Sequence, residues 1–228
     1  MRSGATHAEI ASVSTAETWF REVPGSRIRI VRAVSIAARP EIVWLWVAQI
    51  GRGAGWYSWE HLDNGGRASA RHVVGWIPEP AIGDASAVGY LRHVEPGREL
   101  VWWAPDLPFL GARTWSAWQY TVEPDGDRSR LVMRVDLAAA GPLRWVPLLA
   151  TPVIDAIMAR RQMRRVKAHV ETYGVQDTER DHPETGARDQ YQLFHVIYAS
   201  GDEAGVPGEE NAQQARGWAE ADGILPTV

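Results

Sequence analysis

The feature that most constrains the fold is a series of four strand patterns followed directly by one long helix pattern. The strand candidates cover residues 86–94, 98–104, 113–123 and 129–138. Turns rich in Pro, Gly and Asp join the first pair and the last pair, which predicts antiparallel hairpins. In the last candidate, apolar and polar side chains alternate, so one face is expected to be apolar. The apolar set is Leu131, Met133, Val135 and Leu137, and the polar set is Arg130, Arg134 and Asp136.

The helix pattern covers residues 152–173. Thr151 is a suitable N-cap, Pro152 suits the first helical position, and Gly174 is a suitable C-terminal stop. A helix of this length spans about 33 Å, enough to cross a whole sheet. At 100° per residue, one apolar stripe contains Ala156, Ala159, Met163, Val166, Val170 and Tyr173, and the other side carries Arg160, Arg161, Arg164 and Arg165.

A strand and two short helices are predicted before this series. In the strand at 27–36 the apolar positions share one face, which Arg32 interrupts. A helix is expected from Pro40 to about residue 50, and a second at 56–63. The order strand, helix, helix, strands, long helix predicts an α+β fold. The simplest arrangement is an antiparallel sheet curled around the long helix, with a cleft between them.

Five segments resemble START-like proteins of the polyketide cyclase/dehydrase and lipid-transport superfamily (SRPBCC). The resemblance implies the helix-grip fold, a curved antiparallel sheet wrapped around a long C-terminal helix, with two short helices after strand 1. Proteins of this fold include lipid carriers, hormone receptors and aromatase/cyclases, so the fold does not settle the function. The segments are RAVSIAARPEIVWLW (32–46), QIGRGAGWYSWEHLD (49–63), IPEPAIGD (77–84), WQYTVEP (118–124) and SRLV (129–132).

The resemblance divides the chain into three parts. Residues 1–21 are expected to form an N-terminal extension, and 22–174 the START-like domain. Residues 175–228 hold 11 acidic and 3 basic residues, a net charge of -8, against +4 for the rest of the chain. This acidic tail is expected to be disordered, apart from the apolar stretch 191–198, which could form a strand or a docking segment.

Composition narrows the possible functions. The charge of the first 174 residues is too small and scattered to indicate nucleic-acid binding. No apolar run is long enough for a transmembrane span, and the first ten residues do not resemble a signal peptide. The chain has no Cys, which excludes disulfides and thiol chemistry and suggests a cytoplasmic protein. The preference for Arg over Lys suggests a bacterial, GC-rich source.

Tryptophan is unusually frequent, with 12 residues, and suggests a binding pocket. Large aromatic rings with one polar edge suit a pocket for a flat or apolar ligand, although they also fill cores. Trp102 and Trp103 are consecutive in a strand, so only one of them can face the cleft. The expected ligand-binding residues are Trp56, Trp59, Trp102, Trp118, Tyr120 and Met158.

The candidates for catalysis are Tyr57, Asp63, Arg134 and Asp136. Arg134 and Asp136 are two residues apart in one strand and therefore share a face. No metal is expected, because helical spacing aims Glu60, His61 and Asp63 in different directions. No cofactor is expected either, since the glycine loop 51–55 follows a helix and lacks the dinucleotide-binding pattern.

Three functions are therefore open. The first is binding of a small hydrophobic or aromatic molecule in the cleft, and the second is a cyclase or dehydratase of the polyketide type. The third is a non-catalytic interaction protein that uses the fold and the acidic tail for docking. An enzyme should show polar groups with shifted pKa values converging in the pocket, a carrier an apolar pocket, and a docking protein a filled cleft. The sequence does not indicate an oligomeric state.

Overall fold

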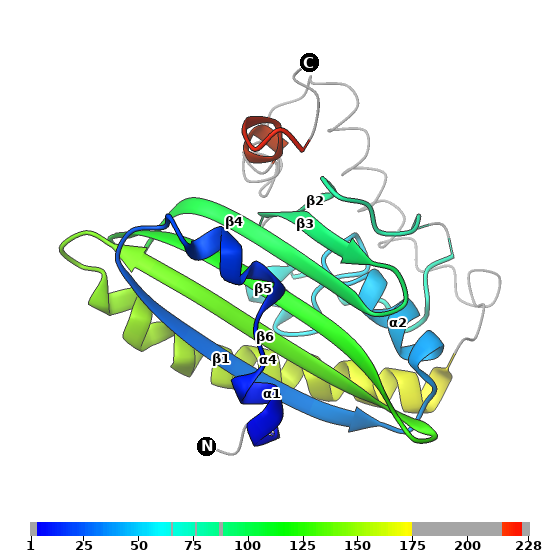
Figure 1. Cartoon of the computed structure of the whole chain (residues 1–228). Helices are drawn as coiled ribbons and strands as arrows, with labels where there is room; N and C mark the ends of the chain where they lie inside the picture. Colours follow the sequence, from blue (N-terminus) through cyan, green and yellow to red (C-terminus); the bar gives the residue numbers. More distant parts are fainter. Residues whose placement is uncertain (1–3, 65, 76, 87–88, 175–215, 225–228) are drawn as a thin grey trace.

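The computed structural model describes residues 4–64, 66–75, 77–86, 89–174 and 216–224. Its centre is one antiparallel sheet of six strands in the order β1-β6-β5-β4-β3-β2 (Figure 1). The strands are β1 (Ser26–Ile36), β2 (Ala85–Ser86), β3 (Gly89–Glu95), β4 (Glu99–Phe109), β5 (Ala112–Asp125) and β6 (Arg128–Ala140).

The strands predicted from the sequence are confirmed, with two differences. The candidate at 86–94 is divided into β2 and β3. Strand β4 continues past Ala104 to Phe109, because an irregularity in its register between Ala104 and Leu107 lets pairing with β5 resume. Asp106 lies in this irregularity with a φ of 51°, so the strand bends there rather than ending. Strand β1 pairs with β6 and forms the edge of the sheet opposite β2.

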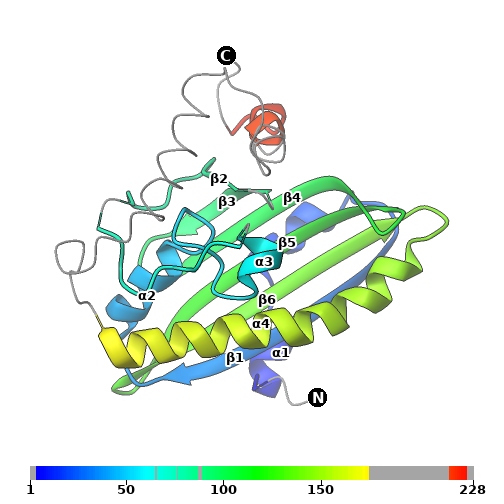
Figure 2. The same ribbon diagram turned by 180° about the vertical axis from the view of Figure 1, so that it is seen from behind.

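Helix α4 (Trp145–Tyr173) crosses the inner face of the sheet, and α2 (Pro40–Ala48) packs beside it (Figure 2). The predicted apolar stripe of α4 is confirmed, except that Tyr173 at its end is exposed. The buried members are Ala156, Ala159, Met163, Val166 and Val170. The same core receives the alternate side chains of β4, β5 and β6 that point inward, among them Trp102, Tyr120 and Met133.

Two helix boundaries differ from the prediction. Helix α4 begins at Trp145, so Thr151 is not its N-cap and Pro152 lies inside it. Pro152 is exposed, and water can therefore satisfy the backbone carbonyl that its missing N–H leaves free. The helix expected at 56–63 is reduced to the single turn α3 (Glu60–Asp63), because Tyr57 has a φ of 60°, which an α-helix cannot contain.

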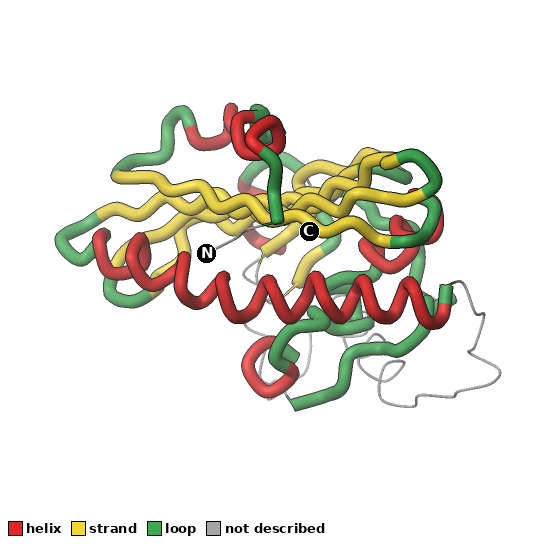
Figure 3. Tube along the Cα trace, turned by 90° about the horizontal axis from the view of Figure 1, so that it is seen from below, coloured by secondary structure: helices red, strands yellow, loops and turns green. Residues whose placement is uncertain are grey.

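The outer face of the sheet is also covered. Helix α1 (His7–Ala11) and the 3-10 helix η1 (Thr15–Phe20) lie on the side of the sheet opposite α4 (Figure 3). A helix at residues 216–221, here called the terminal helix, packs on the same apolar cluster as η1. This cluster, here called the outer cluster, contains Ala16, Phe20, Tyr90, Val101, Trp103, Trp115, Ala117, Ala138 and Ala219.

This arrangement corrects one expectation about the ends of the chain. The sequence predicts disorder for residues 216–224, but Ala219 is fully buried and the hydroxyl of Tyr90 donates a hydrogen bond to Asp222. The stretch 191–198 lies outside the described residues. The architecture as a whole is the α+β helix-grip arrangement, which confirms the START-like fold that the resemblance implied. Among the described helices, none is both long and apolar enough to cross a membrane.

Candidate functional site

The inner face of the sheet carries three large aromatic residues on adjacent strands. Trp102 on β4 lies opposite Trp118 on β5, and Tyr120 is two residues further along β5. Because successive side chains of a strand alternate, all three point toward α4, while Trp103 points into the outer cluster. Trp102 and Tyr120 are fully buried and Trp118 is half-buried.

The loop before α3 brings Trp56 against this aromatic group. The ring centroids of Trp56 and Trp102 lie 5.8 Å apart. Gly51 makes this approach possible, since a Cβ at that position would lie 2.6 Å from the Trp56 ring. The inner face is therefore lined by flat apolar surface contributed by β4, β5 and this loop.

A chain of hydrogen bonds links these aromatics to α4. The Tyr120 hydroxyl lies 3.1 Å from Oε1 of Gln162, to which it donates. The Gln162 amide donates in turn to the backbone carbonyl of Trp56 at 2.7 Å. Burial raises the pKa of the Tyr120 hydroxyl, so this group stays protonated and remains a hydrogen-bond donor. Gln162 therefore fixes both the ring of Tyr120 and the loop that carries Trp56.

A buried ion pair lies between β1 and α4. The guanidinium of Arg32 donates through Nε to Oδ2 of Asp155, and both side chains are buried. Burial raises the pKa of Asp155, although its attraction to Arg32 acts in the opposite direction. Arg32 explains the interruption in the apolar face of β1, because a charged residue can point inward where α4 supplies a carboxylate.

Asp63 is the third polar group on this side. It accepts a hydrogen bond from the Ser58 hydroxyl through Oδ2, whereas Oδ1 is buried without a hydrogen-bond partner. Burial raises the pKa of this carboxyl. The indole Nε1 of Trp102, a donor, is likewise buried without a partner. The negative charges of Asp155 and Asp63 act with burial to raise the pKa of the Tyr120 hydroxyl.

We call this set the inner site. Its aromatic members are Trp56, Trp102, Trp118 and Tyr120, and its polar members are Arg32, Asp63, Asp155 and Gln162.

Three sequence-predicted residues lie elsewhere on this side of the molecule. Trp59 is exposed, with the guanidinium of Arg161 stacked 4.6 Å from its ring centroid. Tyr57 is fully buried, its hydroxyl 2.5 Å from Nε2 of Gln49 and its ring in contact with Trp46. Tyr57 is thus a core residue. Met158 is half-buried on α4.

The structure separates the four residues proposed for catalysis. Tyr57 and Asp63 lie on the side of α4, whereas Arg134 and Asp136 lie on the outer face of β6. The sheet stands between the two pairs, so they cannot form one site. The reason is the alternation of β6, in which Met133 and Val135 take the inward positions.

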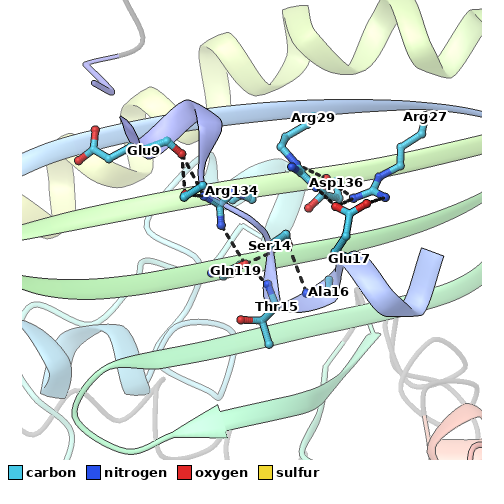
Figure 4. A network of polar contacts seen from close by, with 11 residues as sticks. Glu9, Ser14, Thr15, Ala16, Glu17, Arg27, Arg29, Gln119, Arg134 and Asp136 are labelled. Carbon is cyan, nitrogen blue, oxygen red and sulfur yellow. Dashed lines mark hydrogen bonds and ion pairs between the residues drawn. The ribbon is translucent and has the colours of Figure 1, made fainter. Parts of the chain in front are cut away.

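Arg134 and Asp136 instead hold the N-terminal segment on the sheet (Figure 4). Arg134 donates to Oε1 of Gln119 at 3.3 Å and to the backbone carbonyl of Glu9 at 3.1 Å. Gln119 also accepts a hydrogen bond from the Ser14 hydroxyl at 3.1 Å. Burial lowers the pKa of Arg134, whose Nε has no hydrogen-bond partner.

Asp136 is the centre of a second group on this face. Its carboxylate forms ion pairs with Arg27 at 3.0 Å and Arg29 at 2.7 Å, and Glu17 of η1 pairs with the same two arginines (Figure 4). A hollow of about 470 Å³ lies beside the Arg134 group. The carboxylate of Glu99 on its floor accepts hydrogen bonds from Thr15, Gln119 and Thr121. Apart from Nε of Arg134, these outer-face polar groups bond to one another and hold residues 9–17 on the sheet.

Sequence reasoning missed Arg32, Asp155 and Gln162. Each is a polar residue at a position where the pattern demands an apolar one, and this was the available signal. Arg32 was visible as an interruption of its strand. A helix that begins at Pro152 would place Asp155 in its first turn, where an acidic residue is common, whereas α4 begins at Trp145 and buries it.

No known family's sequence profile matches this chain, and a search of the curated proteins gives no match. Several solved structures match in fold. DynU16, a protein in the dynemicin biosynthetic locus, is 20% identical over 62% of this chain and 47% of its own, with a TM-score of 0.38. The di-domain ARO/CYC StfQ from the steffimycin biosynthetic pathway is 12% identical over 64% of this chain and 51% of its own, with a TM-score of 0.40.

The protein CV1439 from Chromobacterium violaceum is 16% identical over 64% of this chain and 96% of its own, with a TM-score of 0.40. The chain thus spans about half the length of DynU16 and StfQ and nearly all of CV1439. At these identities the likeness concerns the fold alone.

Proposed function

We propose that the protein binds a small aromatic molecule with hydroxyl or carbonyl groups at the inner site, between the sheet and α4. The observation that carries this proposal is a pair of buried polar atoms without partners, Oδ1 of Asp63 and Nε1 of Trp102. An unpaired buried donor or acceptor costs about 1–3 kcal/mol. A ligand hydroxyl donating to Asp63 and a ligand carbonyl accepting from Trp102 would remove both costs.

The surroundings of the two atoms favour an aromatic ligand over an aliphatic one. Trp56 and Trp118, which are only partly buried, offer flat ring faces next to Trp102. Stacked aromatic pairs are worth about 0.5–1.5 kcal/mol beyond the area that they bury. Two hydrogen bonds and two ring contacts together also select for the orientation of the ligand in the site.

One observation favours an enzyme of the cyclase or dehydratase type as the second candidate. Asp63 has a raised pKa and a hydroxyl group, that of Ser58, at hydrogen-bond distance. A carboxyl that is protonated closer to neutral pH can donate a proton to a leaving hydroxyl and take one from an activated carbon. Tyr120 is the second candidate for donating a proton, since its hydroxyl also belongs to the inner site.

Adjacent tryptophans provide a matched test of the proposal. Trp102 and Trp103 are both buried, and Nε1 of each lacks a hydrogen-bond partner, but they lie on opposite faces of the sheet. Trp102→Phe removes the donor and keeps an aromatic ring, and Trp103→Phe does the same on the outer face. Affinity is measured by calorimetric titration with a hydroxylated flavonoid and a hydroxyanthraquinone, with palmitate as the aliphatic comparison.

We expect Trp102→Phe to weaken binding of the aromatic compounds about 5- to 10-fold, the value of one hydrogen bond, and Trp103→Phe to leave it unchanged. Equal effects of the two substitutions would contradict the inner site. Native mass spectrometry of the purified protein gives an independent check, because a tightly held ligand would appear as added mass. If no compound binds and no added mass is seen, the interaction-protein alternative replaces this proposal.

Asp63→Asn separates binding from catalysis. An amide still presents an oxygen to a ligand hydroxyl but cannot transfer a proton at neutral pH. If the variant still binds the flavonoid but loses the turnover measured for the unchanged protein, the result favours an enzyme. A protein that binds the same compounds and turns none of them over is a carrier or receptor.

A further inference from the structure

The first half of α4 presents a row of large apolar side chains to solvent. Trp145, Leu149, Val153 and Ile157 follow one another at intervals of four residues, with 57%, 68%, 60% and 55% of their surface exposed. Ile154 lies beside them and is also exposed. Residues four apart are neighbours on a helix surface, so these side chains form one row, which winds about 120° around the helix from Trp145 to Ile157.

The inner end of the row lies on the buried side of α4, and its outer end turns away from it. At 100° per residue, Ile154 and Ile157 point away from the side that Ala156, Ala159 and Met163 bury. Trp145 and Leu149 lie at nearly the angle of Met163 and are exposed all the same. The side chains of Ile154 and Ile157 point away from the sheet and therefore bury no apolar surface against it. Isolated exposed apolar residues are common, whereas a contiguous exposed stripe usually marks an interaction surface.

Positive charge continues the stripe along the same helix. Arg161 and Arg164 lie on the outward side of the next two turns, with Arg160 and Arg165 flanking them. The two acidic residues of α4 do not oppose this charge on its outward side. Asp155 is buried against Arg32, and Glu171 pairs with Lys167 at the far end.

A hollow of about 450 Å³ lies in the basic half. Its walls are Trp59, Ile157 and the four arginines. Glu60 is the acidic neighbour in this region and forms ion pairs with Arg161 at 4.0 Å and with Arg165. Arg164 is exposed, and none of the ion pairs around the hollow involves it. The hollow therefore combines an aromatic wall with several guanidinium groups, which suits a phosphate-bearing headgroup.

We propose that the outward side of α4 docks on an anionic lipid surface. An anionic bilayer matches both halves at once, because it accepts the protruding apolar side chains below its headgroups and attracts the arginines to its phosphates. A second copy of this chain matches them less well. Parallel helices would place arginines against arginines, and antiparallel helices would place them against the apolar stripe of the partner. The proposal is independent of ligand binding at the inner site.

Co-sedimentation with vesicles tests the proposal on the full chain. One set of vesicles is pure phosphatidylcholine, and the other is an equal mixture of phosphatidylcholine and phosphatidylglycerol. We expect binding to the mixed vesicles that weakens as salt is added, and little binding to phosphatidylcholine alone. Absence of binding to the mixed vesicles overturns the proposal.

Two double variants and their matched controls locate the surface. Val153→Glu with Ile157→Glu should abolish binding, and Arg161→Gln with Arg164→Gln should weaken it about 30-fold. The controls are Val13→Glu, another exposed apolar residue, and Arg98→Gln, another exposed arginine, both away from α4. These should bind as the unchanged protein does, and equal losses in the controls overturn the assignment to α4.

Light scattering of the same proteins tests whether a second copy of this chain, rather than a membrane, binds this surface. If the unchanged protein is a dimer in solution and Ile157→Glu makes it monomeric, the stripe is a subunit interface and the membrane proposal is wrong. The substituted positions are exposed except Arg161, which is half-buried and donates a hydrogen bond to the Ser58 carbonyl. The thermal unfolding midpoint of each variant shows whether its fold is kept.

Discussion

At the scale of single residues, the alternation of side chains along β4 places two consecutive tryptophans on opposite faces of the sheet. Trp102 points toward α4 and Trp103 toward η1, where the ring of Phe20 meets it edge-on at 5.1 Å. The sequence predicts that these residues must diverge, but not which of them faces inward. The choice depends on the register with β5, where Trp102 pairs with Trp118.

Asp63 provides a prediction about pH. Burial raises its pKa above the ordinary value of 3.8, so the folded protein holds this proton more tightly than the unfolded chain does. Stability is therefore lost as the pH rises from about 3.8 through the folded pKa, and Asp63→Asn removes this loss. We expect the variant to gain in unfolding midpoint relative to the unchanged protein as the pH rises from 4 to 7.

Glu9 is the control of opposite sign. Its hydrogen bonds with Arg130 hold the pKa of the carboxyl below the ordinary value of 4.5. The stability that it contributes is complete above about pH 4.5 and is lost as the pH falls through the folded pKa. Glu9→Gln should therefore lower the unfolding midpoint by a constant amount above pH 5 and by less in acid. Parallel pH curves for the Asp63 and Glu9 variants would contradict this account.

At the scale of secondary structure, strands were easier to predict than helix boundaries. Alternating patterns gave the sheet, since burial on one face imposes a period of two on each strand. The start of α4 was missed because Pro152 resembles a first helical residue. The second helix begins later than expected, at Glu60, because Tyr57 has a positive φ that the sequence does not reveal. The contacts of Arg134 and Asp136 with residues 9–17 were missed. In the sequence, these two polar residues have the pattern of a solvent-exposed strand face, and only the structure shows that residues 9–17 cover it.

The aromatic residues expected to bind a ligand lie together in part, and their role in binding stays a prediction. The four that lie on the inner side of the sheet are Trp56, Trp102, Trp118 and Tyr120. Arg32 and Asp155 could not be paired from the sequence, since they are far apart in the chain and depend on where α4 crosses β1.

The Arg32–Asp155 pair gives a prediction about how α4 docks on β1. Arg32→Met leaves the Asp155 carboxylate buried without its partner, which should lower the free energy of unfolding by about 3–5 kcal/mol. The double variant Arg32→Met, Asp155→Leu replaces both charges by apolar groups and should recover most of that loss. Urea unfolding of the single and double variants measures both values. Additive losses would mean that the two side chains do not interact.

At the scale of the whole molecule, the sheet is a shared wall between two cores. One core lies between the sheet and α4, and the other is the outer cluster beneath η1 and the terminal helix. Antiparallel sheets often leave one face to solvent, but here residues from both ends of the chain cover it. The folded unit thus extends beyond the 22–174 segment to residues that are distant in sequence.

The terminal helix should therefore contribute to stability. Ala219 is fully buried against the outer cluster, whereas Ala221, two residues later in the same helix, is exposed. Ala219→Asp would place a charge in the outer cluster and should displace the helix, while Ala221→Asp should change the unfolding midpoint little. A chain that ends at Gly174 should unfold at a lower temperature than the full chain and close to that of Ala219→Asp, since both lose the same cover. If the shortened chain is as stable as the full one, the terminal helix adds no stability and the fold ends at α4.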